Sequence, residues 1–245
     1  MLNLSKFDPV TIGKGKVVVI IGKRGTGKSL LVRDIMYAKR DIPAGIVMSG
    51  TEDGNGFYKQ FVPDCFIFNK FDEKALERLL KRQRELSVKQ RATDVFVVLD
   101  DLMYDRSVMK SETMRQLLFN GRHWKIFLIV TAQFVTNLPA EIRANCDYVV
   151  ACREVIASNR KRLHEMFFGI FPTRRMFEVV FQKCTAGYEV LVMDNTKMSN
   201  KIEDCVFWYK ATANPPPFRV GHPMFWAYHD RMYNPIGDPS LRTFT

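Results

Sequence analysis

A glycine-rich segment near the N-terminus directly follows a run of five apolar residues. Residues 22–29 read Gly-Lys-Arg-Gly-Thr-Gly-Lys-Ser and match the pattern G-x-x-x-x-G-K-S/T. The run before it, residues 17–21, has the composition of a strand buried on both faces. Glycines let such a loop wrap around phosphate groups, so that backbone N–H groups and the N-terminus of the following helix face the anion. The sequence therefore predicts a strand, a phosphate-binding loop (P-loop) and a helix in succession.

The loop predicts a site for ATP and Mg²⁺. Lys28 would reach the β- and γ-phosphates, and the Ser29 hydroxyl would ligate Mg²⁺. The alternative is a glycine-rich turn between a strand and a helix that binds no ligand. The residues expected to contact the nucleotide are Gly22, Lys23, Arg24, Gly25, Thr26, Gly27, Lys28, Ser29 and Leu30.

Two aspartates end a second apolar run, residues 95–99, in the pattern of a Walker B strand. Asp100 would hold Mg²⁺, directly or through water. Asp101 would orient and activate the attacking water, although many ATPases carry a longer Glu at that position. The alternative is a solvated turn after a strand, where Asp is common.

Two further polar residues are candidates for the catalytic set. Gln133 ends the apolar run 126–132 and would contact the γ-phosphate or its water; the alternative is an amide that caps the strand end. Arg122 would act as an arginine finger, whose charge stabilises the transition state of phosphoryl transfer when supplied in cis or in trans. The alternative for Arg122 is a surface arginine that follows a helix.

Short β-branched and aromatic runs alternate with amphipathic segments along the chain. This alternation favours an α/β fold with a mostly parallel central sheet and helices on both faces. We expect strands at residues 16–22, 44–49, 65–68, 95–100, 126–132, 148–152 and 188–193, and helices at 28–40, 72–91, 112–119 and 160–168.

The C-terminal segment differs in composition from the rest. Six of the 11 prolines fall between Pro215 and Pro239, interleaved with aromatic residues. We therefore divide the chain into an ATPase domain, residues 1–213, and a tail, residues 214–245. Because proline disfavours regular helix and central strand, the tail is expected to be extended. Its aromatic residues would dock on another subunit or a capsid protein, or else pack against the tail's own domain.

Charge and cysteine content bound the partners and the compartment. The 37 Lys and Arg residues against 26 Asp and Glu residues give a net charge of +11, which favours a polyanionic partner. The five cysteines form no C-x-x-C pair and are expected to be reduced thiols of an intracellular protein that is not secreted. No apolar stretch approaches the roughly 18 to 20 residues needed to span a bilayer.

Two groups of basic residues are candidates for contact with nucleic acid phosphates, or else are solvated helix faces. The loop 103–111, which contains Arg106 and Lys110, directly follows the Walker B segment. In this position the loop would couple the nucleotide state to the binding of DNA. The first group is Lys74, Arg78, Lys81, Arg82, Arg84, Lys89 and Arg91, and the second is Arg153, Arg160, Lys161, Arg162, Arg174 and Arg175.

Four motifs together resemble the genome-packaging ATPases of large nucleocytoplasmic DNA viruses, the vaccinia-type branch of the FtsK/HerA superfamily. They are the P-loop, Leu-Asp-Asp at 99–101, Gly-Arg-His at 121–123 and Thr-Ala-Gln at 131–133, in this order. Residues 138–147 and Val-Phe-Trp-Tyr-Lys-Ala at 206–211 are also similar to that branch, so the resemblance covers about Gly13 to Ala211. Asp101 departs from the wider superfamily, in which this position is usually Glu.

The resemblance implies a RecA-like ATPase core that moves double-stranded DNA into a capsid. It implies further copies of the chain in a ring, a pentamer or a hexamer, and a capsid or portal-vertex protein as partner. The host cytoplasm, at the viral factory, and the virion are the implied locations.

Two other functions use the same phosphate loop. A P-loop kinase of a nucleotide or small metabolite would need a lid of arginines, which residues 160–162 or 174–175 could supply. A non-catalytic assembly switch would change its affinity for a partner on binding ATP. The pair Asp100 and Asp101 together with Gln133 favours an ATPase over a kinase.

Overall fold

The computed structural model describes residues 2–102, 108 and 111–233, in which eight strands form one sheet. The strand order is β3-β2-β4-β5-β1-β6-β7-β8. The strands from β3 to β6 in this order pair in parallel, whereas β7 and β8 are antiparallel to their neighbours. Their bounds are β1 Val17–Ile21, β2 Ala44–Ser49, β3 Ile67–Phe68, β4 Val95–Asp100, β5 Ile126–Ala132, β6 Tyr148–Ala151, β7 Glu189–Asp194 and β8 Val206–Lys210. The predicted mostly parallel sheet is confirmed.

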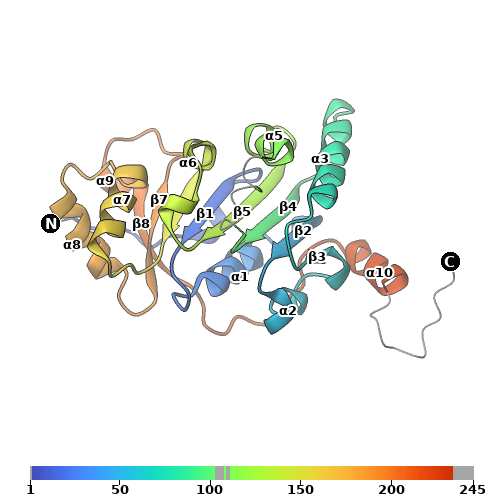
Figure 1. Ribbon diagram of the computed structural model, residues 1–245, viewed down its shortest axis with the longest axis horizontal. Helices are drawn as coiled ribbons and strands as arrows, with labels where there is room; N and C mark the ends of the chain where they lie inside the picture. The colour runs from blue at the N-terminus through green and yellow to red at the C-terminus, as the bar shows by residue number, and fades with distance from the viewer. Residues whose placement is uncertain (1, 103–107, 109–110, 234–245) are drawn as a thin grey trace.

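Both faces of the sheet are covered (Figure 1). Alternate residues of β1 face opposite sides, because side chains alternate along a strand. Val18 and Ile20 pack with α1, whereas Val17 and Val19 pack with α3 and α5. The helices with their bounds are α1 Lys28–Ala38, α2 Glu52–Asn55, α3 Glu73–Val88, α5 Glu112–Asn120, α6 Ala140–Asn145, α7 Ala157–Phe167, α8 Arg174–Cys184, α9 Ile202–Cys205 and α10 Pro223–Met232.

The ends of the helices follow local sequence signals. α3 begins after Asp72, whose carboxylate accepts a hydrogen bond from Ala75 N at 2.8 Å. α8 was not predicted, although Thr173 caps it in the same way and the buried Phe177 and Phe181 have helical spacing. The basic residues at both ends of α8, Arg174, Arg175 and Lys183, interrupt its apolar pattern in the sequence.

The tail is not extended throughout. Residues 214–222 have no regular secondary structure apart from bends, but α10 follows directly. The expectation of extended chain is therefore wrong for α10, because Pro223 occupies the first turn, where a missing N–H costs nothing. The part of the tail from residue 234 onward lies outside the described residues.

The tail's aromatic residues pack on the protein's own domain. The ring of Phe218 stacks on Phe61 with centroids 5.0 Å apart, and Phe225 stacks on Phe66 at 4.3 Å. Tyr228 is half exposed. For Phe218 and Phe225 the structure thus shows the second of the two alternatives, packing within the chain.

Among the described residues no helix combines the length and the apolar character needed to cross a membrane. All five cysteines are free thiols, and three of them are buried.

Candidate functional site

Three neighbouring parallel strands bring most of the predicted site residues to one edge of the sheet. β1 lies beside β5, and β5 lies beside β4. The P-loop follows the carboxyl end of β1, Asp101 follows β4, and Gln133 follows β5. The carboxyl ends of parallel strands are where ligands bind in open α/β sheets. We call this the P-loop edge.

The P-loop has the backbone that a phosphate cradle needs. Gly25 and Gly27 have φ values of 79° and 90°, a left-handed conformation that strongly favours glycine. Lys28 Nζ donates to Lys23 O at 3.3 Å and is buried, so the ammonium group lies across the loop. Because Gly27 caps α1 with no side chain, the first-turn N–H groups are left for a ligand.

Gly22 fits tightly between the loop and the neighbouring strand. Its N–H donates to Ala132 O at 3.0 Å, and a Cβ placed on it would lie 2.6 Å from Cys152 Cβ. Burial raises the pKa of the Cys152 thiol to about 11, so this thiol is neutral at physiological pH. Cys152 therefore serves as a small apolar packing group under the loop.

Hydroxyl groups hold the carboxylate of Asp100, which is 4% exposed. Thr131 Oγ1 donates to Asp100 Oδ1 at 2.6 Å, and Ser49 Oγ donates to Asp100 Oδ2 at 3.2 Å. Tyr58 is buried near Asp100, and the Tyr58 hydroxyl has no hydrogen-bond partner among the described residues. Burial, together with the nearby Asp100 carboxylate, raises the pKa of Tyr58 well above its ordinary value.

Asp101 is held in a strained conformation at the strand end. Its φ of 54° is left-handed, which a non-glycine residue adopts at a cost and often at a functional site. Asp101 N donates to Thr131 Oγ1 at 2.9 Å, and Gln133 Nε2 donates to Asp101 Oδ2 at 2.9 Å. Gln133 and Asp101, both predicted as catalytic, thus contact each other.

The donor set suits Mg²⁺. A hydroxyl from Ser29 and one carboxylate from Asp100 are hard oxygen ligands, and Mg²⁺ commonly takes one or two protein oxygens while phosphates and water fill the other positions. No group of three or more His, Cys, Asp and Glu side chains that could cage a metal occurs among the described residues.

An ion pair joins the P-loop to the segment after β6. Lys23 Nζ lies 3.0 Å from Glu154 Oε1, and Glu154 also accepts hydrogen bonds from Ile156 N and Asn159 Nδ2. Burial alone would raise the pKa of Glu154, but these hydrogen bonds and the Lys23 ammonium lower it overall. Glu154 was not predicted, because nothing in its local sequence signals a partner far away in the chain.

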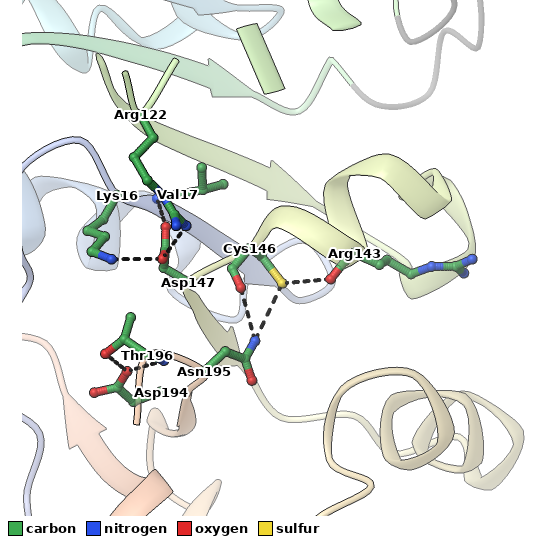
Figure 2. Close-up of polar contacts among 9 residues, drawn as sticks. All are labelled: Lys16, Val17, Arg122, Arg143, Cys146, Asp147, Asp194, Asn195 and Thr196. Atoms are coloured by element: carbon green, nitrogen blue, oxygen red, sulfur yellow. Dashed lines mark hydrogen bonds and ion pairs between the residues drawn. The ribbon is translucent and has the colours of Figure 1, made fainter. Parts of the chain in front are cut away.

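Arg122 lies at the opposite edge of the sheet (Figure 2). Its Nη2 is 2.8 Å from Asp147 Oδ1, which Lys16 Nζ also approaches at 3.0 Å. Asp147 Oδ2 accepts from Val17 N, the first residue of β1, whereas the P-loop follows the last. At about 3.3 Å per residue, roughly 13 Å of strand separates the two edges. Arg122 therefore does not join its own P-loop.

Some basic residues of the two groups are engaged by neighbouring groups, and others are exposed. Arg174 binds Glu178 at 2.8 Å, and Arg160 donates to Val155 O at 2.7 Å, so two of the four arginines in the two segments considered for a kinase lid are already engaged. The first basic group lies along and just beyond α3, and its members are exposed. Arg106 and Lys110 lie outside the described residues.

The family model described as Poxvirus A32 protein matches residues 14–208. An uncharacterized protein of Invertebrate iridescent virus 3 is 39% identical over 85% of this chain and 78% of its own length. An uncharacterized protein of Acanthamoeba polyphaga mimivirus is 34% identical over 96% of this chain and 87% of its own length.

Solved structures share the fold at low identity. A genome packaging NTPase of Sulfolobus turreted icosahedral virus 2, in complex with sulfate, has a TM-score of 0.60 and 17% identity, and the match covers 83% of this chain and 100% of that one. The same NTPase in complex with AMPPCP has a TM-score of 0.57 and 16% identity, covering 84% of this chain and 100% of that one. The pCW3 conjugation coupling protein TcpA has a TM-score of 0.53 and 14% identity, covering 81% of this chain and 60% of that one.

Proposed function

The chain belongs to the poxvirus A32 protein family, and on this premise we propose that it hydrolyses ATP to move viral double-stranded DNA into a capsid. The observation that carries the proposal is the P-loop edge, where the cradle around Lys28 after β1 and the pair of Asp100 and Asp101 at the end of β4 lie at the same end of the sheet, with only β5 between their strands. The genome packaging NTPase that shares the fold has been solved with AMPPCP and with ATP-gammaS, which supports nucleotide binding.

The P-loop residues would hold the phosphates. The amides of residues 22–30 would donate to phosphate oxygens, and Lys28 would contact the β- and γ-phosphates in place of its contact with Lys23 O. Ser29 and Asp100 would hold Mg²⁺, which, when bound, neutralises charge on the phosphates. Thr131 and Ser49 fix both oxygens of Asp100, so this carboxylate is oriented before any ligand arrives.

Asp101 would take the proton of the attacking water. Its Oδ2 is occupied by Gln133 Nε2, which leaves Oδ1 to face the water. The same hydrogen bond would let Gln133 report whether a γ-phosphate is present. Because Asp is one methylene shorter than Glu, the left-handed backbone of Asp101 would compensate by projecting the carboxylate further from the strand end.

Arg122 would act on the P-loop of a neighbouring subunit in a ring. It lies on the far edge of its own sheet, and its side chain is 58% exposed although it is paired with Asp147. A finger supplied in trans would couple hydrolysis to assembly, since the isolated subunit lacks this charge at its site.

DNA would be held mainly through phosphate contacts. The net charge is +11, and the exposed arginines of α3 and of the segment after β6 supply candidates. Arg82→Glu with Arg84→Glu, and Arg153→Glu with Arg175→Glu, remove equal charge from the two groups. The pair that binds DNA should flatten the dependence of log affinity on log salt by about 0.9 for each phosphate that the variant no longer neutralises, and the other pair should not. Equal, salt-independent affinities in all three proteins would exclude the electrostatic mode.

The deciding experiment measures ATP hydrolysis with and without double-stranded DNA. A motor should be stimulated by DNA, a kinase should require a phosphate acceptor, and a switch should turn over negligibly. Lys28→Ala and Asp100→Asn should abolish turnover while the domain stays folded. Lys197→Ala, which removes an exposed lysine far along the chain, is the matched control. Wild-type turnover in Lys28→Ala and Asp100→Asn would refute the assignment of the site.

The partners and the location follow from the proposed activity. The partners of such a motor would be further copies of the chain, in a ring of five or six, and a capsid or portal-vertex protein. The motor would work at the viral factory in the host cytoplasm and would be retained in the virion.

A further inference from the structure

Tyr188 occupies a turn position that a bulky residue rarely adopts. The turn joins α8 to β7, and Glu189 N donates to Ala186 O at 3.2 Å across it. Its two central residues, Gly187 and Tyr188, have φ values of 61° and 66°. Two positive φ values at these positions are typical of a type I′ turn, in which Gly, Asn and Asp dominate. A tyrosine there is an outlier, and such outliers gather at functional sites.

Burial does not account for this tyrosine. Tyr188 is 70% exposed, so its ring gains little from leaving water. The start of the neighbouring strand β7 offers apolar residues for packing, but they are covered by the sheet and its helices. The conformational cost at Tyr188 is therefore offset by nothing within the described residues of this chain.

The fold places this ring beside the P-loop. β7 runs antiparallel to β6 with Ala151 opposite Leu191, so residues before β7 lie beyond the carboxyl end of β6, at the P-loop edge. A Cβ placed on Gly27 would lie 3.8 Å from Tyr188 Cδ1, which is ordinary van der Waals contact. The ring thus reaches the glycine that caps α1, where the phosphate cradle opens to solvent.

Beside the turn lies a cavity of about 490 Å³. Its lining includes Gly187, Gln182, Thr185, Arg153 and Glu154, which combine hydrogen-bonding groups with charges of both signs. Lys210 Nζ lies 3.9 Å from where a Cβ on Gly187 would be. Space and polar groups for a sugar or a base edge therefore adjoin an exposed aromatic face.

We propose that the ring of Tyr188 is the platform on which the base of the bound nucleotide stacks. The proposal rests on the proposed function, because the P-loop must hold the triphosphate for the nucleoside to project from the cradle at Gly27. An aromatic ring at that mouth offers its face to a base, and such stacking accepts every base, because each has a π-face. The selection of Tyr over Asn or Gly in the turn is then explained by ligand binding.

The test compares ATP with inorganic tripolyphosphate, which has the phosphates but no base, as ligands of the full chain without DNA. Tyr188→Ala should weaken ATP binding by about 5- to 150-fold, the loss expected for one stacked base, and leave tripolyphosphate binding unchanged. Tyr188→Phe should retain wild-type affinity for both ligands. Tyr188→Asn should lose ATP affinity as Tyr188→Ala does, yet melt at the wild-type temperature or higher, because Asn suits the left-handed turn.

The possible outcomes separate the base platform from the phosphate site. ATP affinity that is unchanged in Tyr188→Ala, or an equal loss for ATP and tripolyphosphate, overturns the platform. Lys28→Ala should lose both ligands, so its failure to do so, or a wild-type protein that binds neither ligand, refutes the proposed phosphate site instead. Unchanged ATP affinity combined with altered assembly in Tyr188→Ala would assign the ring to a subunit contact and would equally overturn the proposal.

Discussion

Gly22 is the residue at which the P-loop meets the rest of the sheet. A Cβ there would lie 2.5 Å from Thr26 Oγ1 and 2.6 Å from Cys152 Cβ, both closer than atoms can approach without displacement. Thr26 Oγ1 is itself engaged, since it donates to Lys23 O at 2.7 Å. The glycine is thus required by close approach, in contrast to Gly25 and Gly27, where positive φ requires it.

Gly22→Ala should therefore destabilise the protein and loosen the cradle. We expect a loss of about 1–3 kcal/mol in the free energy of unfolding, as for other overpacked positions, and weaker binding of ATP. Urea unfolding and nucleotide titration measure the two effects. Gly54→Ala is the control: it lies in α2 with no atom within 4 Å of a new Cβ, so its stability should be unchanged or raised. Equal effects of the two substitutions would contradict the packing argument.

At the scale of elements, strands were easier to predict than helices. Each of the seven expected strands exists. Such strands are predictable because an apolar run bounded by charged or glycine residues identifies a buried strand without information from elsewhere in the chain. β8 is marked in the sequence only by its family motif, because the side chains of Phe207 and Trp208 are half-buried in this last strand of the sheet and show no clear alternation. The sequence does not predict α8 or α10, because α8 begins with two arginines and α10 begins with a proline in a proline-rich segment.

The placement of the candidate site residues was predictable only where a residue directly follows a strand or loop that the sequence itself marks. Lys28, Asp100, Asp101 and Gln133 each stand at the end of a recognisable strand or loop, and parallel strands must bring these ends together. The contacts that fix them were not predictable, because Thr131 and Ser49 reach Asp100 from two different strands. The contact between Arg122 and Asp147 was likewise not predictable, because the two residues are 25 positions apart in the sequence.

Helix α10 should stabilise the domain mainly through the side chain of Phe225. Phe225 is 7% exposed and contacts Phe66, whereas Tyr228 of the same helix is 50% exposed. Phe225→Ala should lower the free energy of unfolding by about 3–5 kcal/mol. Tyr228→Ala, the matched control on the same helix, should change it by less than about 1 kcal/mol. Thermal and urea unfolding provide the measurement, and similar losses for both would show that the tail is not anchored by Phe225.

At the scale of the whole molecule, two buried thiols and one partly buried thiol should make the stability of the protein fall at alkaline pH. Burial raises the pKa values of Cys65, Cys146 and Cys152 to about 11, above the ordinary thiol value of 9.0. A folded-state pKa above the unfolded one means that the unfolded chain loses its proton first. The contribution of these thiols to the free energy of unfolding is therefore complete below pH 9 and is lost as the pH rises from 9 to 11.

The free energy of unfolding should accordingly fall steeply over this pH window. Urea unfolding from pH 7 to 11 under reducing conditions measures it. Cys152→Ala removes one of the three thiols, so its stability should fall less steeply than that of the wild type across the same range. Parallel curves for the two proteins would show that the Cys152 thiol does not contribute.

Assembly should decide whether the molecule hydrolyses ATP at all. Arg122 lies across the sheet from its own P-loop and pairs with Asp147 there, so the proposed arginine finger would have to act on the nucleotide of a neighbouring subunit. Lys28→Ala and Arg122→Ala subunits should each be inactive alone, because every interface lacks one of the two groups. A mixture should regain activity, since interfaces form in which an intact Lys28 faces an intact Arg122. Hydrolysis is measured over a range of protein concentrations. Lys197→Ala mixed with Lys28→Ala controls for dilution, and equal specific activity of monomers and assembled protein would contradict a finger supplied in trans.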